Sequence, residues 1–305
     1  MKLATTTGDL LYYSRTPAEA IRAFENTGFR HLDFSFWRMA WGDRPLLKDD
    51  WKKPIAEAAE EAEKIGMDFV QAHSPGLDPL SSENPEEVVL ANVRAIEACG
   101  FLGIEKIVVH AGMNGAYRYP DDKAEYFAAN RAFYRRLFPA MEKYGVKVLI
   151  ENGSAAPGDP FFPTSGQDLA EFVDFCGHPL LGVCWDAGHG NIRHESPYEQ
   201  LVAVGERLEA VHIQDNFGKA DNHLAPYMGN LDLDALMQGL FDCGYVGRGG
   251  FFTFECDNIL RQSRRRDERF LQKANPTPIE LKQKAVSLMY EIGKHILTGY
   301  DCFEE

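Results

Sequence analysis

Long apolar runs are missing from this chain. No stretch approaches the roughly 18 uninterrupted apolar residues that span a bilayer, so we expect no membrane segment. The segment Met1–Leu11 carries one lysine and no apolar core, so we expect no secretion signal. The six cysteines include no CxxC pair. We therefore expect a cytoplasmic protein with reduced thiols.

Positive charge is also scarce. Lys and Arg number 32 against 46 Asp and Glu, which gives a net charge of −14. Nucleic-acid binding depends on Lys and Arg, which displace the counterions of the phosphates. The charge balance therefore disfavours nucleic acid as a partner and favours a small molecule, although a local basic face can occur on an acidic protein.

Short apolar runs alternate with longer amphipathic runs along the whole chain. Runs rich in β-branched and apolar residues are typical of buried parallel strands. Eight βα units in order, with no linker or shift in composition, predict an α/β fold, a closed (β/α)₈ TIM barrel formed by residues 1–305 as one domain. The predicted strands are Lys2–Thr6, His31–Ser35, Met67–His73, Lys106–His110, Lys147–Glu151, Leu181–Asp186, Ala210–Gln214 and Phe251–Glu255.

Helical runs with good propensity separate these strands, and a glycine follows most of them. Gly100 is expected to end the third helix and Gly145 the fourth. The predicted helices are Thr16–Asn26, Asp50–Lys64, Pro85–Cys99, Asp121–Tyr144, Ser165–Cys176, Pro197–Val204, Leu233–Cys243 and Pro278–Leu297.

Six predicted strands end in, or next to, a carboxylate or an imidazole. In a barrel the carboxyl ends of the strands converge on one axis, where active sites are built. Carboxylates gathered there would repel one another or stay protonated unless a cation lay among them. Oxygen and nitrogen ligands without a thiolate suit Mn²⁺, Mg²⁺, Co²⁺ or Zn²⁺. The six residues are His73, His110, Glu151, Asp186, His212 and Glu255.

Two local patterns add candidates next to this group. Asp186 and His189 form a DxxH, and Asp221 and His223 form a DxH in the loop after the seventh strand. Taken alone, each fragment is better explained by an ordinary hydrogen-bonded turn or a solvated side chain. The six strand-end residues together favour a functional site.

At these residues the chain resembles the xylose-isomerase-like barrels. This superfamily includes sugar isomerases, ketose 3-epimerases, sugar-phosphate isomerase/epimerases and zinc-dependent AP endonucleases. The resemblance covers nearly the whole chain, most clearly from the third to the eighth strand. Its motifs are Leu149-Ile-Glu151-Asn152, Asp186-x-x-His189, Val211-His212-Ile-x-Asp215, Asp221-x-His223 with Gly229, and Phe254-Glu255.

The resemblance implies roles for nine residues. Glu151, Asp186, His212 and Glu255 would ligate one divalent ion (Mn, Mg, Co or Zn), and Glu151 and Glu255 would also be the catalytic acid/base pair. In the endonuclease branch, residues of the types found at the remaining five positions are further metal ligands. In the sugar-active branch they bind substrate, which is the role we expect for His73, His110, His189, Asp221 and His223.

The leading functional hypothesis is a metal-dependent isomerase/epimerase of a sugar or sugar phosphate. A metal acidifies the carbon next to a carbonyl, one carboxylate takes the proton to give a metal-stabilised enediolate, and a second carboxylate returns it. The alternative is an AP endonuclease-like phosphodiesterase with up to three zinc ions. A barrel that binds a small molecule without turnover is a third, weaker possibility. The acidic charge and the isolation of Arg38 and Arg44 in the second βα loop favour the sugar enzyme with one ion.

Two further groups have several interpretations. The arginines after the last strand fit a substrate phosphate, a contact in a homo-oligomer or, with better support, a solvated loop: Arg261, Arg264, Arg265, Arg266 and Arg269. The aromatic residues after the second strand fit a wall against a sugar ring or, equally well, core packing or a subunit contact: Phe34, Phe36, Trp37 and Trp41.

Overall fold

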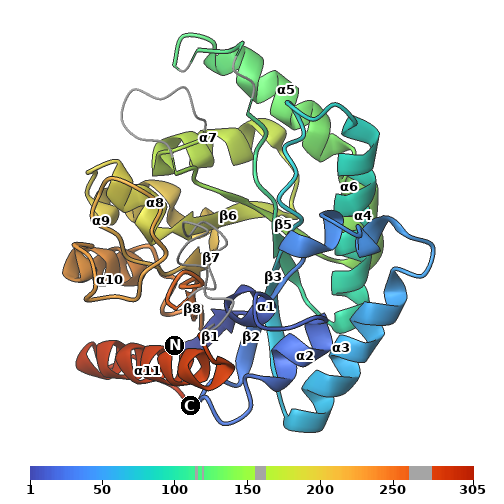
Figure 1. Ribbon diagram of the computed structural model, residues 1–305. Coiled ribbons are helices and arrows are strands. Elements are labelled where there is room, and N and C mark those ends of the chain that lie inside the picture. Colours follow the sequence, from blue (N-terminus) through green and yellow to red (C-terminus); the bar gives the residue numbers. More distant parts are fainter. Residues whose placement is uncertain (114–115, 119, 155–162, 261–276) are drawn as a thin grey trace, which may run out of the picture.

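Eight parallel strands surround one axis, and helices cover them on the outside (Figure 1). The computed structural model describes residues 1–113, 116–118, 120–154, 163–260 and 277–305. The predicted TIM barrel is confirmed. Its strands are β1 (Lys2–Thr6), β2 (His31–Ser35), β3 (Asp68–His73), β4 (Lys106–Val108), β5 (Lys147–Glu151), β6 (Leu181–Asp186), β7 (Leu208–His212) and β8 (Phe251–Phe254).

The strands are hydrogen-bonded in the order β7-β6-β5-β4-β3-β2-β1-β8. The barrel closes between β7 and β8 at Ile213, just beyond the end of β7. The Ile213 amide donates to the Thr253 carbonyl at 2.8 Å, and the Glu255 amide donates to the Ile213 carbonyl at 3.0 Å. Strand ends that are distant in sequence therefore meet around one axis.

Two irregularities in strand pairing set which residues face each other. Between β2 and β3 the register shifts after Leu32, so that Asp33 pairs with Gln71. Between β6 and β7 it shifts after Val183, so that Asp186 pairs with His212. Bulges of this kind are common beside active sites because they redirect side chains.

The helices are α1 (Gly8–Leu11), α2 (Pro17–Arg22), α3 (Lys52–Ile65), α4 (Pro85–Leu102), α5 (Lys123–Arg135), α6 (Phe138–Tyr144), α7 (Gly166–Cys176), α8 (Ala187–Ile192), α9 (Pro197–Val204), α10 (Leu233–Asp242) and α11 (Ile279–Gly299). The short 3₁₀ turns are η1 (Trp37–Ala40), η2 (Pro45–Leu47) and η3 (Gly205–Arg207). Several helices begin after a side chain that accepts a backbone N–H of the first turn, as Ser165 does for α7 and Asp232 for α10. No helix among the described residues is long and apolar enough to cross a membrane.

Two helix predictions were wrong. The segment predicted as one helix over Asp121–Tyr144 forms α5 and α6, with Pro139 in the first turn of α6, where a missing N–H costs nothing. Gly100 does not end α4. It lies inside the helix, where a Cβ would stand 2.9 Å from the Tyr144 Cβ, so its role is close packing. The helix ends instead at Gly103, which has φ of +71°.

The main core lies between the strands and the surrounding helices. A small second cluster consists of the buried residues Val108, Leu149, Cys184 and Ala210, one from each of the strands β4 to β7. Helix α11, at the bottom of Figure 1, packs beside β1 and β8. A Cβ at Gly293 would stand 2.7 Å from both Leu3 Cδ2 and Phe254 Cε2.

We expect Gly293→Ala to destabilise the protein by about 1–3 kcal/mol relative to Gly299→Ala, because the added methyl overpacks the buried contact of α11 with β1 and β8. Gly299 lies on the same helix, and a Cβ there meets nothing within 4 Å, so the same substitution is its matched control. Urea unfolding followed by circular dichroism measures both. Equal midpoints for the two variants would contradict this packing.

Candidate metal centre

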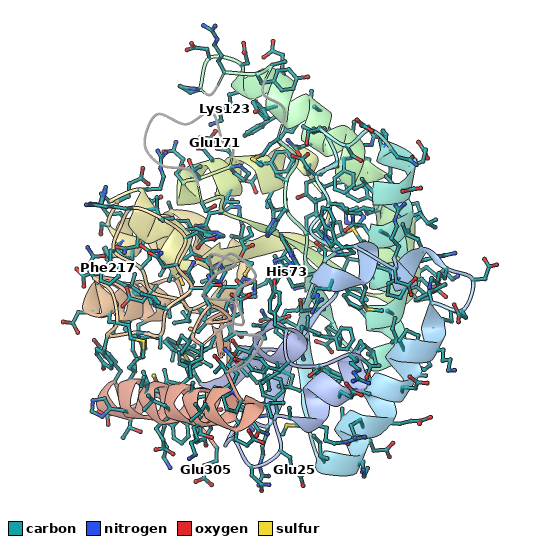
Figure 2. All side chains as sticks on the ribbon, in the orientation of Figure 1. Glu25, His73, Lys123, Glu171, Phe217 and Glu305 are labelled. Carbon is teal, nitrogen blue, oxygen red and sulfur yellow. The ribbon has the colours of Figure 1, made fainter. Side chains whose placement is uncertain are left out.

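A cavity of about 500 Å³ opens at the carboxyl ends of the strands. Seven of the nine predicted site residues line it, namely His73, His110, Glu151, His189, Asp221, His223 and Glu255. The other two, Asp186 and His212, are fully buried beside them. Figure 2 shows His73 near the middle of the molecule, while Glu25, Phe217 and Glu305 lie at its periphery.

Four of these residues form the group that was predicted to hold a metal. Glu151, Asp186 and His212 end β5, β6 and β7, and Glu255 directly follows β8. Each offers one ligand atom, and these four atoms lie within 4.8 Å of one another. The His212 Nδ1 is 2.5 Å from Glu151 Oε1 and 3.1 Å from Glu255 Oε2.

The buried carboxylate of Asp186 tests whether this group fits a cation. Its Oδ1 accepts the His189 backbone N–H at 2.6 Å. Its Oδ2 is buried and has no hydrogen-bond partner. Burial raises the pKa of Asp186 to about 7. A buried carboxylate oxygen without a donor is costly unless a cation binds it. The four residues therefore fit a divalent ion with oxygen and nitrogen ligands.

The sequence suggested that the carboxylates would repel one another or stay protonated without a cation. In the structure imidazoles lie between them and stabilise the anionic form of two of the three carboxylates. Burial would raise the pKa of Glu151, but the charge of His212 and hydrogen bonds from His110 and His212 hold it well below its usual range. Glu255 behaves alike, with a pKa of about 2 despite its burial, because His212 is close. Of these three carboxylates only Asp186 has a raised pKa.

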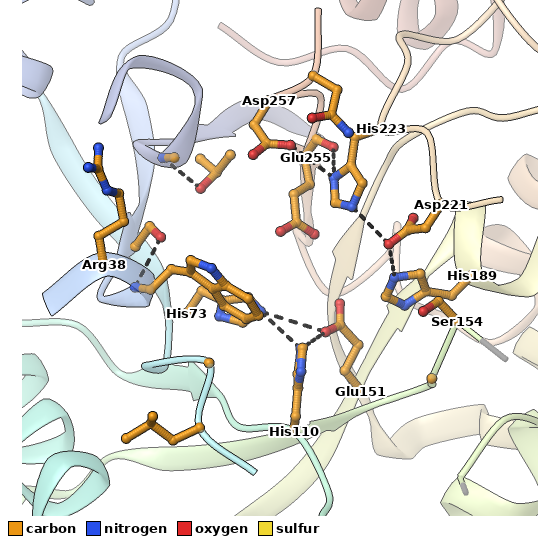
Figure 3. Close-up of a pocket in the computed structure, with 18 of the residues that line it drawn as sticks. Arg38, His73, His110, Glu151, Ser154, His189, Asp221, His223, Glu255 and Asp257 are labelled. Carbon is orange, nitrogen blue, oxygen red and sulfur yellow. Dashed lines mark hydrogen bonds and ion pairs between the residues drawn. The ribbon is translucent and has the colours of Figure 1, made fainter. Parts of the chain in front are cut away.

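A second group consists of His189, Asp221 and His223 (Figure 3). The Asp221 Oδ2 lies 3.2 Å from His189 Nε2 and 3.1 Å from His223 Nε2. The Nδ1 of His189 donates to the Asn152 carbonyl at 2.7 Å, and that of His223 to the Glu255 carbonyl at 2.9 Å. Both rings thus turn Nε2 toward Asp221, the arrangement that ligating histidines adopt.

A third group consists of His73, His110 and Glu151. His73 donates from Nδ1 to the Ser74 carbonyl at 3.0 Å, and its Nε2 lies 3.1 Å from the Nε2 of His110. The same His110 nitrogen is 2.6 Å from Glu151 Oε2. Glu151 therefore belongs to both the first and the third group.

Several polar residues of the site escaped the sequence analysis. Asp33 and Gln71 lie inside β2 and β3, and Gln214 follows β7. The Gln214 Nε2 donates to Asp221 Oδ1 at 2.6 Å and lies 3.3 Å from Asp186 Oδ1, so it joins the first two groups. A polar residue within an otherwise apolar run, as in His-Leu-Asp33-Phe-Ser, was the available signal.

The aromatic residues after β2 divide between core and cavity. Phe34 and Phe36 are buried in the core, which agrees with core packing and not with a wall against a sugar ring. Trp37 lines the cavity and packs edge-on against His73 and His110. A Cβ at Gly76 would stand 2.3 Å from this indole, so only glycine leaves room for it. Trp41 is 51% exposed and outside the cavity lining. The arginines from Arg261 to Arg269 lie outside the described residues.

Comparison with known proteins gives the family. The sequence profile of the xylose isomerase-like TIM barrel family matches residues 21–273. The chain belongs to this family. An uncharacterized protein of Sinorhizobium fredii is 33% identical over 199 residues, which are 63% of this chain and 59% of the relative. The chain thus spans 59% of that relative's length.

Solved structures share the architecture of this xylose isomerase-like barrel. A D-tagatose 3-epimerase-like protein superposes with a TM-score of 0.73 at 22% identity, over 98% of this chain and 97% of the other. The IolI protein with a bound zinc atom also gives 0.73, at 15% identity, over 100% of both chains. Identities this low establish the fold alone.

The affinity of this xylose isomerase-like barrel for a divalent ion is expected to rise between pH 6 and pH 8. Because burial raises the pKa of Asp186 to about 7, this predicted ligand carries a proton below neutrality, and the proton must leave before a cation binds. Although burial disfavours its charge, the neighbouring Cys184, Glu255 and Glu151 raise the pKa of His212, so the His212 proton is displaced over the whole range. Each proton displaced lowers the affinity about tenfold per pH unit below the pKa. Zinc titration calorimetry at pH 6, 7 and 8, in buffers that differ in ionisation enthalpy, measures the affinity and the protons released. An affinity that stays constant over this range would count against Asp186 as a ligand.

Proposed function

We propose that this protein is a divalent-metal-dependent isomerase or epimerase of a sugar or sugar phosphate, with Glu151 and Glu255 as its proton-transfer pair. The observation that carries the proposal is the pair itself. Both carboxylates flank the His212 Nδ1, and both line the same cavity. Among the described lining residues, Arg38 is the only Lys or Arg, which suits a small polyol better than a polyanion.

The ligand group of Glu151, Asp186, His212 and Glu255 would hold the ion. A divalent ion supplies positive charge that makes the C–H bond beside a sugar carbonyl more acidic. Glu151, almost fully buried and anionic, accepts that proton, and His110 donates to its Oε2 and fixes its orientation. Glu255 is more exposed, so it can take up a proton from solvent and deliver it to the substrate carbon from another side of the cavity. Glu151 then releases its own proton to solvent, which restores the starting state. His189, Asp221 and His223, joined through the two Nε2 atoms and Asp221 Oδ2, line the cavity and would bind substrate hydroxyls.

A second candidate function is phosphodiester cleavage with several zinc ions. One observation favours it. The nine predicted residues fall into three groups of ligand atoms, each within 4.8 Å, and Glu151 is shared between two of them. Against it stands the cavity lining, where Asp78, Glu151, Asp221, Glu255 and Asp257 outnumber Arg38. A groove for a long polyanion needs several cations.

We expect Glu151→Gln and Glu255→Gln each to lower turnover by about 10²-fold or more, because the first removes the positioned proton acceptor and the second the positioned proton donor. Glu209→Gln is the matched control, since Glu209 pairs with Lys147 at the opposite end of the strands. A panel of ketoses and ketose phosphates in deuterated water gives the rates and the label. The product should carry solvent deuterium. Transfer of substrate deuterium without solvent label would show a hydride shift and remove the proton-transfer role.

The number of bound ions separates the two candidates. We expect about one equivalent of divalent metal per chain, and chelation should abolish turnover while circular dichroism stays native, because the apolar core supplies the folding energy. His223→Gln should leave one equivalent bound and lower turnover. About three equivalents of zinc, reduced by His223→Gln, together with cleavage of a duplex containing an abasic site, would establish the phosphodiesterase instead. Unfolding on chelation would show that the metal is structural.

A further inference from the structure

A buried carboxylate that belongs to none of the three ligand groups lies on the side of the His212 ring away from Glu151 and Glu255. Asp33, in the middle of β2, is fully buried. Its Oδ2 is 3.1 Å from His212 Nε2, the ring nitrogen that faces away from Glu151 and Glu255. In the described part of the chain, the ion pair found for Asp33 is the one with His212. A buried anion without Lys or Arg is expensive, so its retention calls for a specific role.

The surroundings of Asp33 fix its orientation. The Gln71 Nε2 donates to the same Oδ2 at 2.9 Å. Thr253 donates to the Gln71 Oε1 at 3.2 Å, which sets the amide with its NH₂ toward Asp33. This series of hydrogen bonds connects β8, β3 and β2 with His212 on β7 through the barrel interior. The register shift between β2 and β3 is what sets Asp33 opposite Gln71.

We propose that Asp33 is a positioning residue, which holds His212 with its proton on Nε2 so that the Nδ1 lone pair faces the metal site. The inference rests on the metal centre of the proposed function, but not on which substrate is turned over. Nε2 lies 3.1 Å from Asp33 Oδ2 and 3.1 Å from Gln71 Nε2, and the carboxylate holds a proton on it. Nδ1 lies 2.5 Å from Glu151 Oε1 and 3.1 Å from Glu255 Oε2, so a bound cation would replace the proton that Nδ1 shares with these carboxylates. A carboxylate bonded to the far nitrogen fixes the tautomer of a ligating histidine and makes it a stronger donor to the cation.

The local geometry makes the oxygen at the Oδ2 position essential. Two donors, from Gln71 and His212, converge on it. The other oxygen, Oδ1, is buried and has no partner. In Asp33→Asn the amide oxygen can keep both hydrogen bonds, and its NH₂ then takes the unpartnered side. The substitution keeps the shape and removes the charge that strengthens His212 as a ligand.

Metal affinity without substrate tests the role of Asp33. Zinc binding is measured by competition with a coloured chelator, and Asp33→Asn should bind about 10- to 100-fold more weakly than the unmutated protein. Asp168→Asn is the matched control, because Asp168 is another buried aspartate in an ion pair. It lies in the first turn of α7 and pairs with Lys123. The zinc affinity of Asp168→Asn should equal that of the unmutated protein. Equal affinities in Asp33→Asn and the unmutated protein would overturn the inference.

A second measurement needs no variant, so it remains decisive if Asp33→Asn does not fold. Long-range ¹H–¹⁵N spectra of the zinc-loaded protein identify which His212 nitrogen binds the ion. We expect ligation through Nδ1 with a proton on Nε2, and ligation through Nε2 would overturn the inference. A protein that binds zinc in this way but converts no sugar would refute the proposed function and leave the role of Asp33 intact.

Discussion

The site depends on the pairing of buried imidazoles with buried carboxylates. His212 has Glu151 and Glu255 beside one ring nitrogen and Asp33 beside the other. Each of these groups would be costly to bury alone, and each is stabilised because an opposite charge is adjacent. Removing one member leaves its neighbours with uncompensated charge. The cluster therefore behaves as one unit, and the contribution of a single residue cannot be isolated by deleting it.

The barrel brings this cluster together although no single segment of the sequence contains more than a few of its residues. Each strand needs only one polar residue at its carboxyl end, and closure brings these ends to a common axis. The two register shifts refine the arrangement by setting Asp33 opposite Gln71 and Asp186 opposite His212. Side-chain chemistry thus comes from the strand ends, while the relative orientation of the side chains comes from the bulges.

The sequence predicts most of the fold because the pattern of hydrophobic residues differs between buried strands, which are short apolar runs, and amphipathic helices, where apolar residues recur every three to four positions. The bounds of β1, β2, β5 and β6 agree with the prediction. Errors arise where one residue type serves two purposes. Gly100 provides close packing with Tyr144, whereas Gly103 provides the positive φ that ends the helix. Sequence alone cannot separate a glycine needed for its small size from one needed for its backbone.

The candidate site was predictable where a polar residue ends an apolar strand, and much less so inside a strand. The structure brings all nine predicted residues into or beside one cavity. Asp33 and Gln71 went unnoticed because a strand buried on both faces shows no alternation, so the side facing the axis cannot be read from the pattern. Their partnership also depends on a bulge, which follows from the pairing of two strands and not from either strand alone.

The junction between β7 and β8 at Ile213, called the seam below, affects how the barrel responds when a ligand fills the cavity. These strands meet through two backbone hydrogen bonds on Ile213, and His212 and Glu255 lie on opposite sides of that junction. A ligand bound by both side chains would link β7 to β8 at Ile213, where the sheet has its fewest backbone hydrogen bonds. Opening of the seam and release of the ligand then become one linked equilibrium. Slower amide exchange at Ile213 and Glu255 would be the local sign of a filled site, with little change on the far side of the barrel.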